Sequence, residues 1–377
     1  MKKWIKRILA ALLILVLVCV LAFCGLYLGR FKTLASIRKV SAYEDGYNLY
    51  RMDIKYDYSL DDIIASGITN DQSMVDAIVK EALPLLPVSI KAPSFGCTAF
   101  TMQDTDGDIH MGRNYDFKDD TSAMLVYCTP KCGYKSVALA ALNNISANTP
   151  DASTKQKLSA LTAPFVCLDG MNEKGVSIAV LTLDSAPTRQ STGKPVISTM
   201  LLPAGGLLET LAIRLVLDRA ATTQEAVDLL KGYDMFASSG RDYHFYITDA
   251  SGDGRVIEYD CDDPARGLVE TKTEAVTNFF VMYKDKVLPN QKNGIYGHGR
   301  ERYDAVLNVF QASAAHTNDT AWQALQAAAQ DPNPQDITSN TQWSLNYNNT
   351  DLTVEIVLRR HWQDIFRYEL NGNQLQQ

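Results

Sequence analysis

Histidine is scarce in this chain, and several familiar kinds of site have no sequence signature in it. The 377 residues include five histidines, and none stands in the setting of a histidine-assisted cysteine protease. There is no internal repeat and no glycine-rich loop of the type that holds phosphate groups. Cys128 and Cys132 have no second cysteine pair or nearby histidine, which argues against zinc. Asp104, Asp106 and Asp108 lack the bidentate glutamate of a calcium loop, so we expect a turn there and no metal.

Acidic residues are absent from the first 39 positions, which hold eight basic residues. The rest of the chain carries 28 basic against 43 acidic side chains, a net charge of −15. An acidic body is unsuited to a phosphate backbone, and we therefore expect no nucleic-acid partner. An ordinary solvated surface explains this charge sufficiently.

The N-terminus predicts a membrane anchor. A basic head, residues 1–7, precedes Ile8–Leu28, a run of twenty-one residues without a charged side chain. As a helix this run is about 31 Å long, close to the hydrocarbon thickness of about 30 Å. A cleaved signal peptide, with a shorter apolar run and a small-residue exit, is one alternative. Lipidation of Cys24 is another, although the bulky Phe23 precedes it. The basic head is expected to stay cytoplasmic, which places the body outside a cell membrane that the chain crosses once.

Cys97 stands at the start of a predicted β-hairpin. Strands on both sides of the turn at 104–108 would bring Arg113 and Asp116 near the thiol, although they follow it by sixteen and nineteen residues. A buried cysteine is by default inert packing. A cysteine beside charged groups has a route to a lowered pKa and can act as a nucleophile. Five of the seven cysteines follow the apolar run, so at least one is unpaired in a monomer.

The residues around Cys97 resemble a known family. Gly-Cys-Thr-x-Phe followed by Gly-Arg-Asn-x-Asp-Phe is similar to the start of the mature choloylglycine hydrolases, which include bile salt hydrolases and penicillin V acylases. These enzymes cut linear amide C–N bonds and belong to the N-terminal-nucleophile hydrolases. Further blocks similar to the family occur in family order, at 169–180, 276–278, 302–303 and 341–344.

The resemblance implies an α+β fold, a four-layer αββα sandwich of the N-terminal-nucleophile hydrolase type. Predicted strands, then helices, then strands again agree with two sheets covered by helices. One transmembrane helix would precede this sandwich. We expect residues 1–30 to form the cytoplasmic head and anchor, 31–96 a stalk or propeptide with helical spacing over Leu60–Leu86, and 97–377 the catalytic domain.

The resemblance also implies roles for single residues. Cys97 would be the nucleophile with its own α-amine as the base, Arg113 would set the charge around the thiolate, and Asp116 would orient the amine. Asn278 and the backbone N–H of Thr182 would bind the oxyanion. The family usually has Asn or Tyr where Thr182 stands. Because a backbone N–H is available from any residue, this departure leaves the chemistry intact and puts the substrate in doubt.

The last site arginine has two candidates. Arg302 precedes an aromatic residue, as the family's arginine does. Arg300 lies two residues earlier and is followed by a glutamate. The resemblance therefore favours Arg302, with Arg300 as the alternative.

Three functions remain open at this point. The favoured one is hydrolysis of a small-molecule linear amide through an acyl-thioester on Cys97, without a cofactor. The alternatives are an acyltransferase that passes the acyl group to another amine, and a non-enzymatic binding protein on the same fold. A bile salt, penicillin V, an acyl-homoserine lactone, a peptide or another amide could be the substrate. A homo-oligomer is possible.

An N-terminal nucleophile also requires that residues 1–96 be removed from Cys97. The related acyltransferases cut a long precursor at Gly-Cys, and Gly96-Cys97 has the residues for the same self-cleavage. The glycine leaves the carbonyl unshielded, so that the thiol can attack it. A cut by another protease and an unprocessed, inactive chain are the alternatives.

Overall fold

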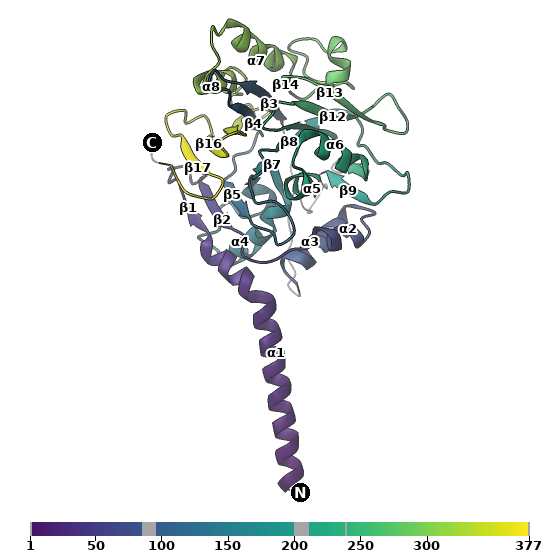
Figure 1. The fold of residues 1–377 in the computed structure, drawn as a ribbon, viewed down its shortest axis with the longest axis vertical. Coiled ribbons are helices and arrows are strands. Elements are labelled where there is room, and N and C mark those ends of the chain that lie inside the picture. The colour runs from purple at the N-terminus through teal and green to yellow at the C-terminus, as the bar shows by residue number, and fades with distance from the viewer. Residues whose placement is uncertain (1, 85–95, 200–210, 238–239, 376–377) are drawn as a thin grey trace.

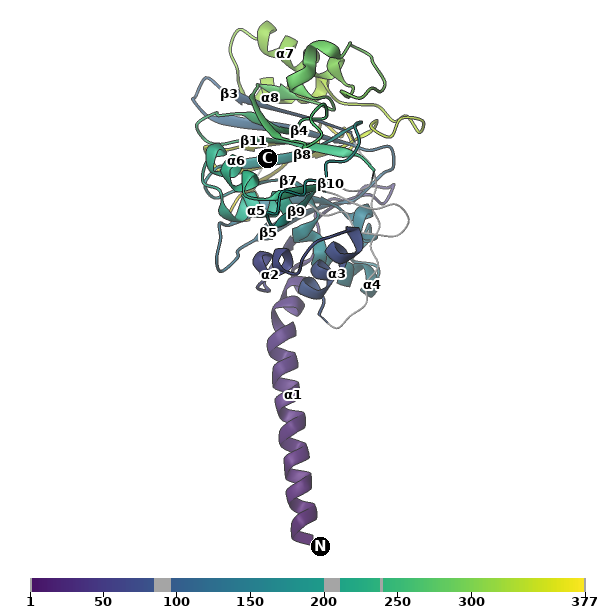
Figure 2. The same cartoon turned by 90° about the vertical axis from the view of Figure 1, so that its right-hand side faces the viewer.

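The computed structural model describes residues 2–84, 96–199, 211–237 and 240–375. A long helix leads into a layered body (Figure 1). From the outside inward, the side view in Figure 2 shows α7 (Arg300–Ala312) and α8 (Asn318–Ala327), a six-stranded sheet and a nine-stranded sheet. Beneath the second sheet lie α5 (Leu211–Arg219) and α6 (Thr223–Lys231). This is the predicted four-layer αββα arrangement.

The nine-stranded sheet is antiparallel except where β2 pairs in parallel with β5. In each of the other neighbouring pairs of this sheet, the two strands run in opposite directions. The central strands β5, β6 and β7 are buried at every position, because the other sheet covers one face and helices the other. In spatial order the strands are β1 (Arg38–Lys39), β2 (Leu49–Asp53), β5 (Ala123–Cys128), β6 (Ser136–Ala141), β7 (Cys167–Asn172), β8 (Ser177–Leu183), β11 (Asp242–Thr248), β12 (Arg255–Tyr259) and β13 (Leu268–Lys272).

The six-stranded sheet carries the predicted hairpin, which is confirmed. Its strands are all antiparallel, and β3 and β4 pair along their full length. In the turn between them, Asp104 Oδ1 accepts hydrogen bonds from the backbone N–H of Asp106 and Asp108. The spatial order is β14 (Ala275–Val276), β3 (Gly96–Gln103), β4 (Ile109–Asp116), β15 (Thr341–Asn348), β16 (Thr353–Leu358) and β17 (Phe366–Glu369).

Helices pack on the outer face of each sheet. On the nine-stranded sheet α5 contacts β7 and β8, and on the six-stranded sheet α8 contacts β4. The remaining elements are short: α2 (Leu60–Ala65), α3 (Asp71–Ala82), α4 (Thr154–Ser159), η1 (Leu142–Ile145), η2 (Ala160–Phe165), η3 (Val281–Lys286) and a parallel pair, β9 (Val196–Thr199) with β10 (Asp234–Ala237).

Residues 31–84 pack into the body. Strand β2 lies inside the nine-stranded sheet, and its Leu49, Tyr50 and Met52 are completely buried. Helices α2 and α3 confirm the helical spacing predicted from Leu60 onward, and Gly67, with a φ of +80°, separates them. Residues 85 and 86 of that predicted stretch lie outside the described part of the chain.

The predicted apolar run forms helix α1 (Lys2–Ser36), and among the described residues it is the one helix long and apolar enough to cross a membrane. Its last turns are embedded in the body. Arg30 is buried there and donates from Nε to the carbonyl oxygen of Ala82 at the end of α3 (2.7 Å). Thr33 is buried as well, and its hydroxyl accepts from the backbone N–H of Lys55 (2.7 Å).

Candidate active site

The β3–β4 hairpin presents Cys97 and Arg113 on one face. Cys97 pairs across the strands with Tyr115, which lies two residues after Arg113. Side chains alternate between the faces of a strand, so these three point the same way. That direction is the space between the two sheets, because Arg113 reaches the carbonyl of Val180 on β8. Asp116 lies on the opposite face of β4, at its end.

Arg113 is completely buried and links the two sheets. Its Nη2 donates to the carbonyl oxygen of Val180 (2.9 Å), and its Nε lies 3.4 Å from a carboxylate oxygen of Asp169 on β7. Asp169 also accepts hydrogen bonds from Trp343 Nε1 (3.2 Å) and from the Tyr347 hydroxyl (3.0 Å), both on β15. Burial raises the pKa of Asp169, and the Arg113 guanidinium opposes this shift.

The thiol of Cys97 is fully buried while the bond to Gly96 is intact. Burial raises the pKa of the thiol to about 12, although the neighbouring Arg113 guanidinium favours the thiolate. The charge of Asp116 adds to the rise, and that of Arg302 opposes it. Cys97 is therefore a neutral thiol near neutral pH in this structure.

Asn278 and Arg302 hold the backbone of Cys97. The Cys97 N–H donates to Asn278 Oδ1 (2.9 Å), and Arg302 Nη1 donates to the Cys97 carbonyl oxygen (2.7 Å). Arg302 Nη2 donates to the same Asn278 oxygen (2.8 Å). Arg300 instead pairs with Asp304, one turn along the same helix. The structure thus brings Arg302, and not Arg300, to Cys97.

Asp116 and Thr182 border the same group. Asp116 accepts a hydrogen bond from the Thr341 hydroxyl (2.6 Å) and lies 3.5 Å from Arg302 Nη1. Burial raises the pKa of Asp116, and Arg302 opposes this shift. The carbonyl oxygen of Thr182 accepts from Asn278 Nδ2 (2.8 Å). The Thr182 hydroxyl is buried and has no hydrogen-bond partner among the described residues.

All the predicted site positions therefore lie around one cysteine. Gly96 is buried at the start of β3 and pairs with Asp116 across the hairpin. Helix α7, strand β8 and the segment after β14 supply the other members, and these elements surround β3 in Figure 1. The gathered positions are Gly96, Cys97, Arg113, Asp116, Thr182, Asn278 and Arg302.

Sequence reasoning missed two carboxylates near the site. Asp169 lies within a recognised block, but its pairing with Arg113 joins strands of different sheets. The signal for it was an aspartate directly after the apolar run 165–168. Asp184 pairs with His298 (Oδ2 to Nδ1, 2.7 Å), and these two residues are 114 positions apart. A histidine between two glycines was the only local signal for this pair.

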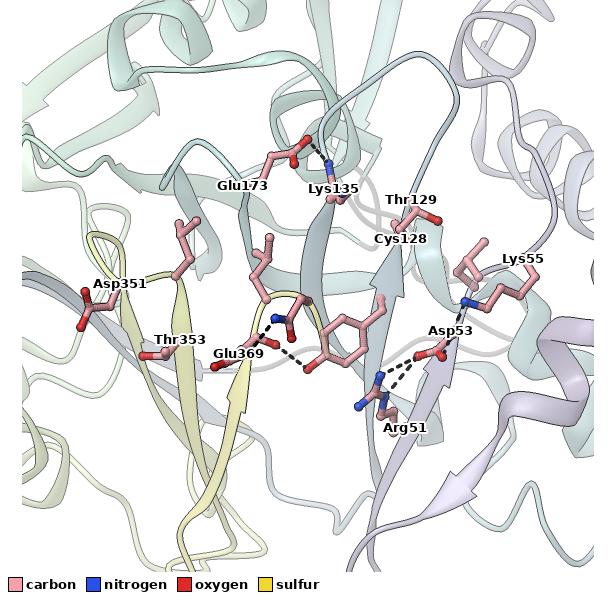
Figure 3. A pocket seen from close by; sticks show the side chains of 15 residues that line it. Arg51, Asp53, Lys55, Cys128, Thr129, Lys135, Glu173, Asp351, Thr353 and Glu369 are labelled. Atoms are coloured by element: carbon pink, nitrogen blue, oxygen red, sulfur yellow. Dashed lines mark hydrogen bonds and ion pairs between the residues drawn. The ribbon is translucent and has the colours of Figure 1, made fainter. Parts of the chain in front are cut away.

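A cavity of about 760 Å³ lies away from Cys97. It opens where β2 meets the C-terminal strands, and most of its charged side chains pair with each other or with backbone groups (Figure 3). Arg51 pairs with Asp53 (3.0 Å) and stacks over the ring of Tyr127, whose hydroxyl donates to the carbonyl oxygen of Glu369. We interpret this cavity as part of the packing interface between the N-terminal segment and the body.

Comparison with known proteins supports the predicted family. Residues 97–264 match the model of the linear amide C–N hydrolases, choloylglycine hydrolase family, and this match begins at Cys97 itself. No curated protein matches the chain.

Solved structures show the same fold. Penicillin V acylase from Agrobacterium tumefaciens has a TM-score of 0.50 and 17% identity, over 73% of this chain and 86% of that one. A mutant and a variant of conjugated bile acid hydrolase from Clostridium perfringens give TM-scores of 0.50 and 0.51 at 14% identity, over 74% of this chain and 97% of theirs. At such low identity these likenesses concern the fold, and the predicted sandwich of the N-terminal-nucleophile hydrolase type is confirmed.

The buried ion pair of the site yields a prediction about stability. Asp169→Ala should lower the free energy of unfolding by about 3–5 kcal/mol, because it leaves the Arg113 charge buried without its partner. Tyr347→Phe removes only one hydrogen bond to the same carboxylate and should cost about 1 kcal/mol. Thermal unfolding of the detergent-solubilised chain measures both. Equal losses in the two variants would contradict this account of the pair.

Proposed function

We propose that this chain is a cysteine amidohydrolase, because residues 97–264 match the model of the linear amide C–N hydrolases, choloylglycine hydrolase family. The observation that supports the proposal most strongly is the hydrogen-bond set at Cys97. Asn278 and Arg302 bind the backbone of this residue, and Arg113 lies against its thiol. Residues 97–377 would form the catalytic domain.

We assign the first chemical step to the thiol of Cys97 and the α-amine of the same residue. A free α-amine has a pKa of about 7.7–8.0, so an appreciable part of it is unprotonated near neutral pH. The amine takes the thiol proton while the sulfur attacks the amide carbonyl, and it then gives this proton to the leaving amine. Water hydrolyses the thioester and releases the acid. Asp116 would orient the α-amine, and Arg113 would stabilise the thiolate.

We assign the oxyanion to Asn278 and Thr182. Asn278 already contacts Cys97 in the uncut chain, and its side-chain amide donates to the Thr182 carbonyl, so Thr182 lies beside Asn278. An oxyanion donor of this kind typically contributes about 10²–10³ to the rate. The donor from Thr182 would be its backbone N–H, which does not depend on the side chain.

We further propose that the chain cuts itself between Gly96 and Cys97. The thiol would attack the Gly96 carbonyl and the C–N bond would break, with the thiol proton passing to the nitrogen. The resulting thioester between Gly96 and the sulfur would then be hydrolysed. The cut would come first, because the base for hydrolysis of other amides exists only after it.

The N-terminal piece would stay bound after this cut. Strand β2 pairs with β5 over five residues, and the Tyr58 hydroxyl donates to the Asp218 carboxylate on α5 (3.0 Å). The Tyr56 hydroxyl donates to the carbonyl oxygen of Leu161 (2.6 Å). Residues 31–96 would thus act as a propeptide that remains a subunit, attached to residues 1–30 as the anchor.

The activity proposal predicts the effect of one substitution. Cys97→Ala should abolish amide cleavage and leave the circular dichroism spectrum unchanged, because the thiol is the attacking group. The measurement is mass spectrometry of released amine from penicillin V, a conjugated bile acid and a panel of N-acyl anilides. Cys261→Ala, which changes a cysteine outside the site, is the matched control and should retain activity.

Full amide cleavage by the Cys97→Ala variant would contradict the assignment of Cys97 as the nucleophile. Addition of amine acceptors separates the two enzymatic alternatives. Acyl transfer to an added amine, at the expense of free acid, would identify an acyltransferase. Absence of any Cys97-dependent acyl chemistry would leave the binding-protein alternative.

The maturation proposal predicts two tightly bound chains. Denaturing electrophoresis should separate them, and the larger should begin Cys-Thr-Ala-Phe, whereas gel filtration in mild detergent should recover one complex. Cys97→Ala should stay uncut, and Cys261→Ala should be cut normally. A cut in Cys97→Ala would point to another protease, and an intact, fully active chain would rule out the α-amine mechanism.

We also propose that α1 anchors the protein in the cell membrane, with the N-terminus cytoplasmic and the body outside. The length of the helix and its basic start support this topology. Protease added to intact cells should then digest the body, and a control cytoplasmic protein should survive. A body that is digested only after lysis contradicts the topology, and a body found free in the medium indicates a cleaved signal.

A further inference from the structure

Gly96 is packed so closely that its α-carbon has room for hydrogen only. A Cβ built on it would lie 2.4 Å from the Cβ, 2.6 Å from the carbonyl oxygen and 2.8 Å from the Cα of Thr338. Two of these three atoms belong to the backbone, so no change of rotamer relieves the contact. Thr338 therefore forms a wall against the carbon that carries the Gly96 carbonyl.

Hydrogen bonds on both sides hold this wall in place. The hydroxyl and the backbone N–H of Thr338 both donate to Asp336 Oδ1 (2.7 and 2.9 Å). His298 Nε2 lies 3.2 Å from the same hydroxyl, and its Nδ1 lies 2.7 Å from Asp184 Oδ2. Arg241 pairs with the other oxygen of Asp184 (3.0 Å). Thr338 and His298 are both buried, with exposed fractions of 3% and 7%.

The support for the wall is continuous with the proposed catalytic residues. The backbone N–H of His298 donates to the carbonyl oxygen of Asn278 (2.9 Å). The flanking Gly297 and Gly299 have φ angles of +101° and +87°. A Cβ on Gly297 would lie 2.1 Å from that same carbonyl oxygen, and one on Gly299 would lie 2.4 Å from Arg302 Nη2. The turn that carries His298 thus packs against both Asn278 and Arg302, the two residues that bind the backbone of Cys97.

The cut at Gly96 and the hydrolysis of a substrate pass through the same kind of intermediate. In each, an acyl group forms a thioester with the Cys97 sulfur, and the attacked carbonyl must lie about 3–3.5 Å from it. Because the proposed mechanism uses the same sulfur and the same oxyanion donors for both reactions, the α-carbon of a substrate's acyl group falls close to the place that the Gly96 α-carbon occupies. Thr338 would then lie against the α-carbon of Gly96 before the cut and against the α-carbon of the substrate's acyl group after it.

We propose that the Thr338 wall, positioned by His298, restricts this enzyme to acyl groups whose α-carbon is an unbranched CH₂. This inference rests on the proposed amidohydrolase function and names its substrate class. Straight-chain and arylacetyl amides fit the rule. An amide whose acyl α-carbon bears a further substituent, such as the peptide bond after any residue with a side chain, does not fit.

Matched pairs of 4-nitroanilides test the rule on the full chain in detergent. The pairs are hexanoyl with 2-methylhexanoyl, and phenylacetyl with 2-phenylpropanoyl, each branched member as its single enantiomers. The unbranched member should have a kcat/KM at least about tenfold higher, since one methyl group in a tight site discriminates by about 10–200-fold. The amide of the earlier panel that is cleaved fastest is compared with its α-methyl or α-unbranched homologue in the same way.

Substitutions at Thr338 and His298 test whether the selectivity ratio depends on the exact position of the wall. Thr338→Ser keeps the hydroxyl and its hydrogen bonds and should retain the ratio. Thr338→Val keeps the shape but loses these bonds, and His298→Ala removes one support, so both should lower the ratio several-fold. A general structural defect would reduce both members of a pair alike and leave the ratio unchanged.

A wild-type ratio near one would overturn the inference while leaving the amidohydrolase function standing. A high ratio that neither Thr338→Val nor His298→Ala lowers would also overturn the assignment to this wall. Cleavage of no amide at all would be a failure of the proposed function, and the inference would fall with it.

Discussion

The buried ion pair of Arg113 and Asp169 connects the stability of this sandwich to its proposed chemistry. The arginine belongs to β4 and the aspartate to β7, so the pair spans the core between the two sheets. Trp343 and Tyr347 of a third strand hold the carboxylate. A buried ion pair is weakly stabilising, but a single buried charge is costly. Because the same guanidinium lies against the thiol of Cys97, neither residue can change without affecting both core and site.

Burial keeps the thiol of the proposed nucleophile, Cys97, protonated in the uncut chain. The Cys97 thiol has a pKa raised to about 12, and the amine that would deprotonate it is still part of a peptide bond. Asn278 accepts a hydrogen bond from the Cys97 N–H, and Arg302 donates one to the Cys97 carbonyl oxygen. Two residues of the proposed site are therefore in place around Cys97 before the cut. A single bond cleavage would supply the missing base without any rearrangement of the sheets.

Sequence patterns predicted the features of this fold that are formed by residues close together in the chain. The hairpin could be read because its strands and turn are contiguous, and the family blocks marked Asn278 and Arg302 across a long separation. The choice between Arg302 and Arg300 rested on one neighbouring aromatic residue, and the helix settles which of them faces Cys97. No turn signal in the sequence indicates the parallel pairing of β2 with β5, since 69 residues, 54–122, lie between the two strands. The pairing of Asp184 with His298 was out of reach for the same reason.

Helix α1 is joined to the sandwich too firmly to act as a flexible linker. Gly29 approaches the backbone so closely that a Cβ would lie 2.7 Å from the Lys55 carbonyl oxygen. One turn later Thr33 binds the N–H of the same residue, and Arg30 binds the end of α3. The two contacts to Lys55 lie directly after β2, which is itself a strand of the sheet. In the proposed topology the helix and the nine-stranded sheet therefore move as one unit, and the orientation of the catalytic layers above the membrane is set by the protein itself.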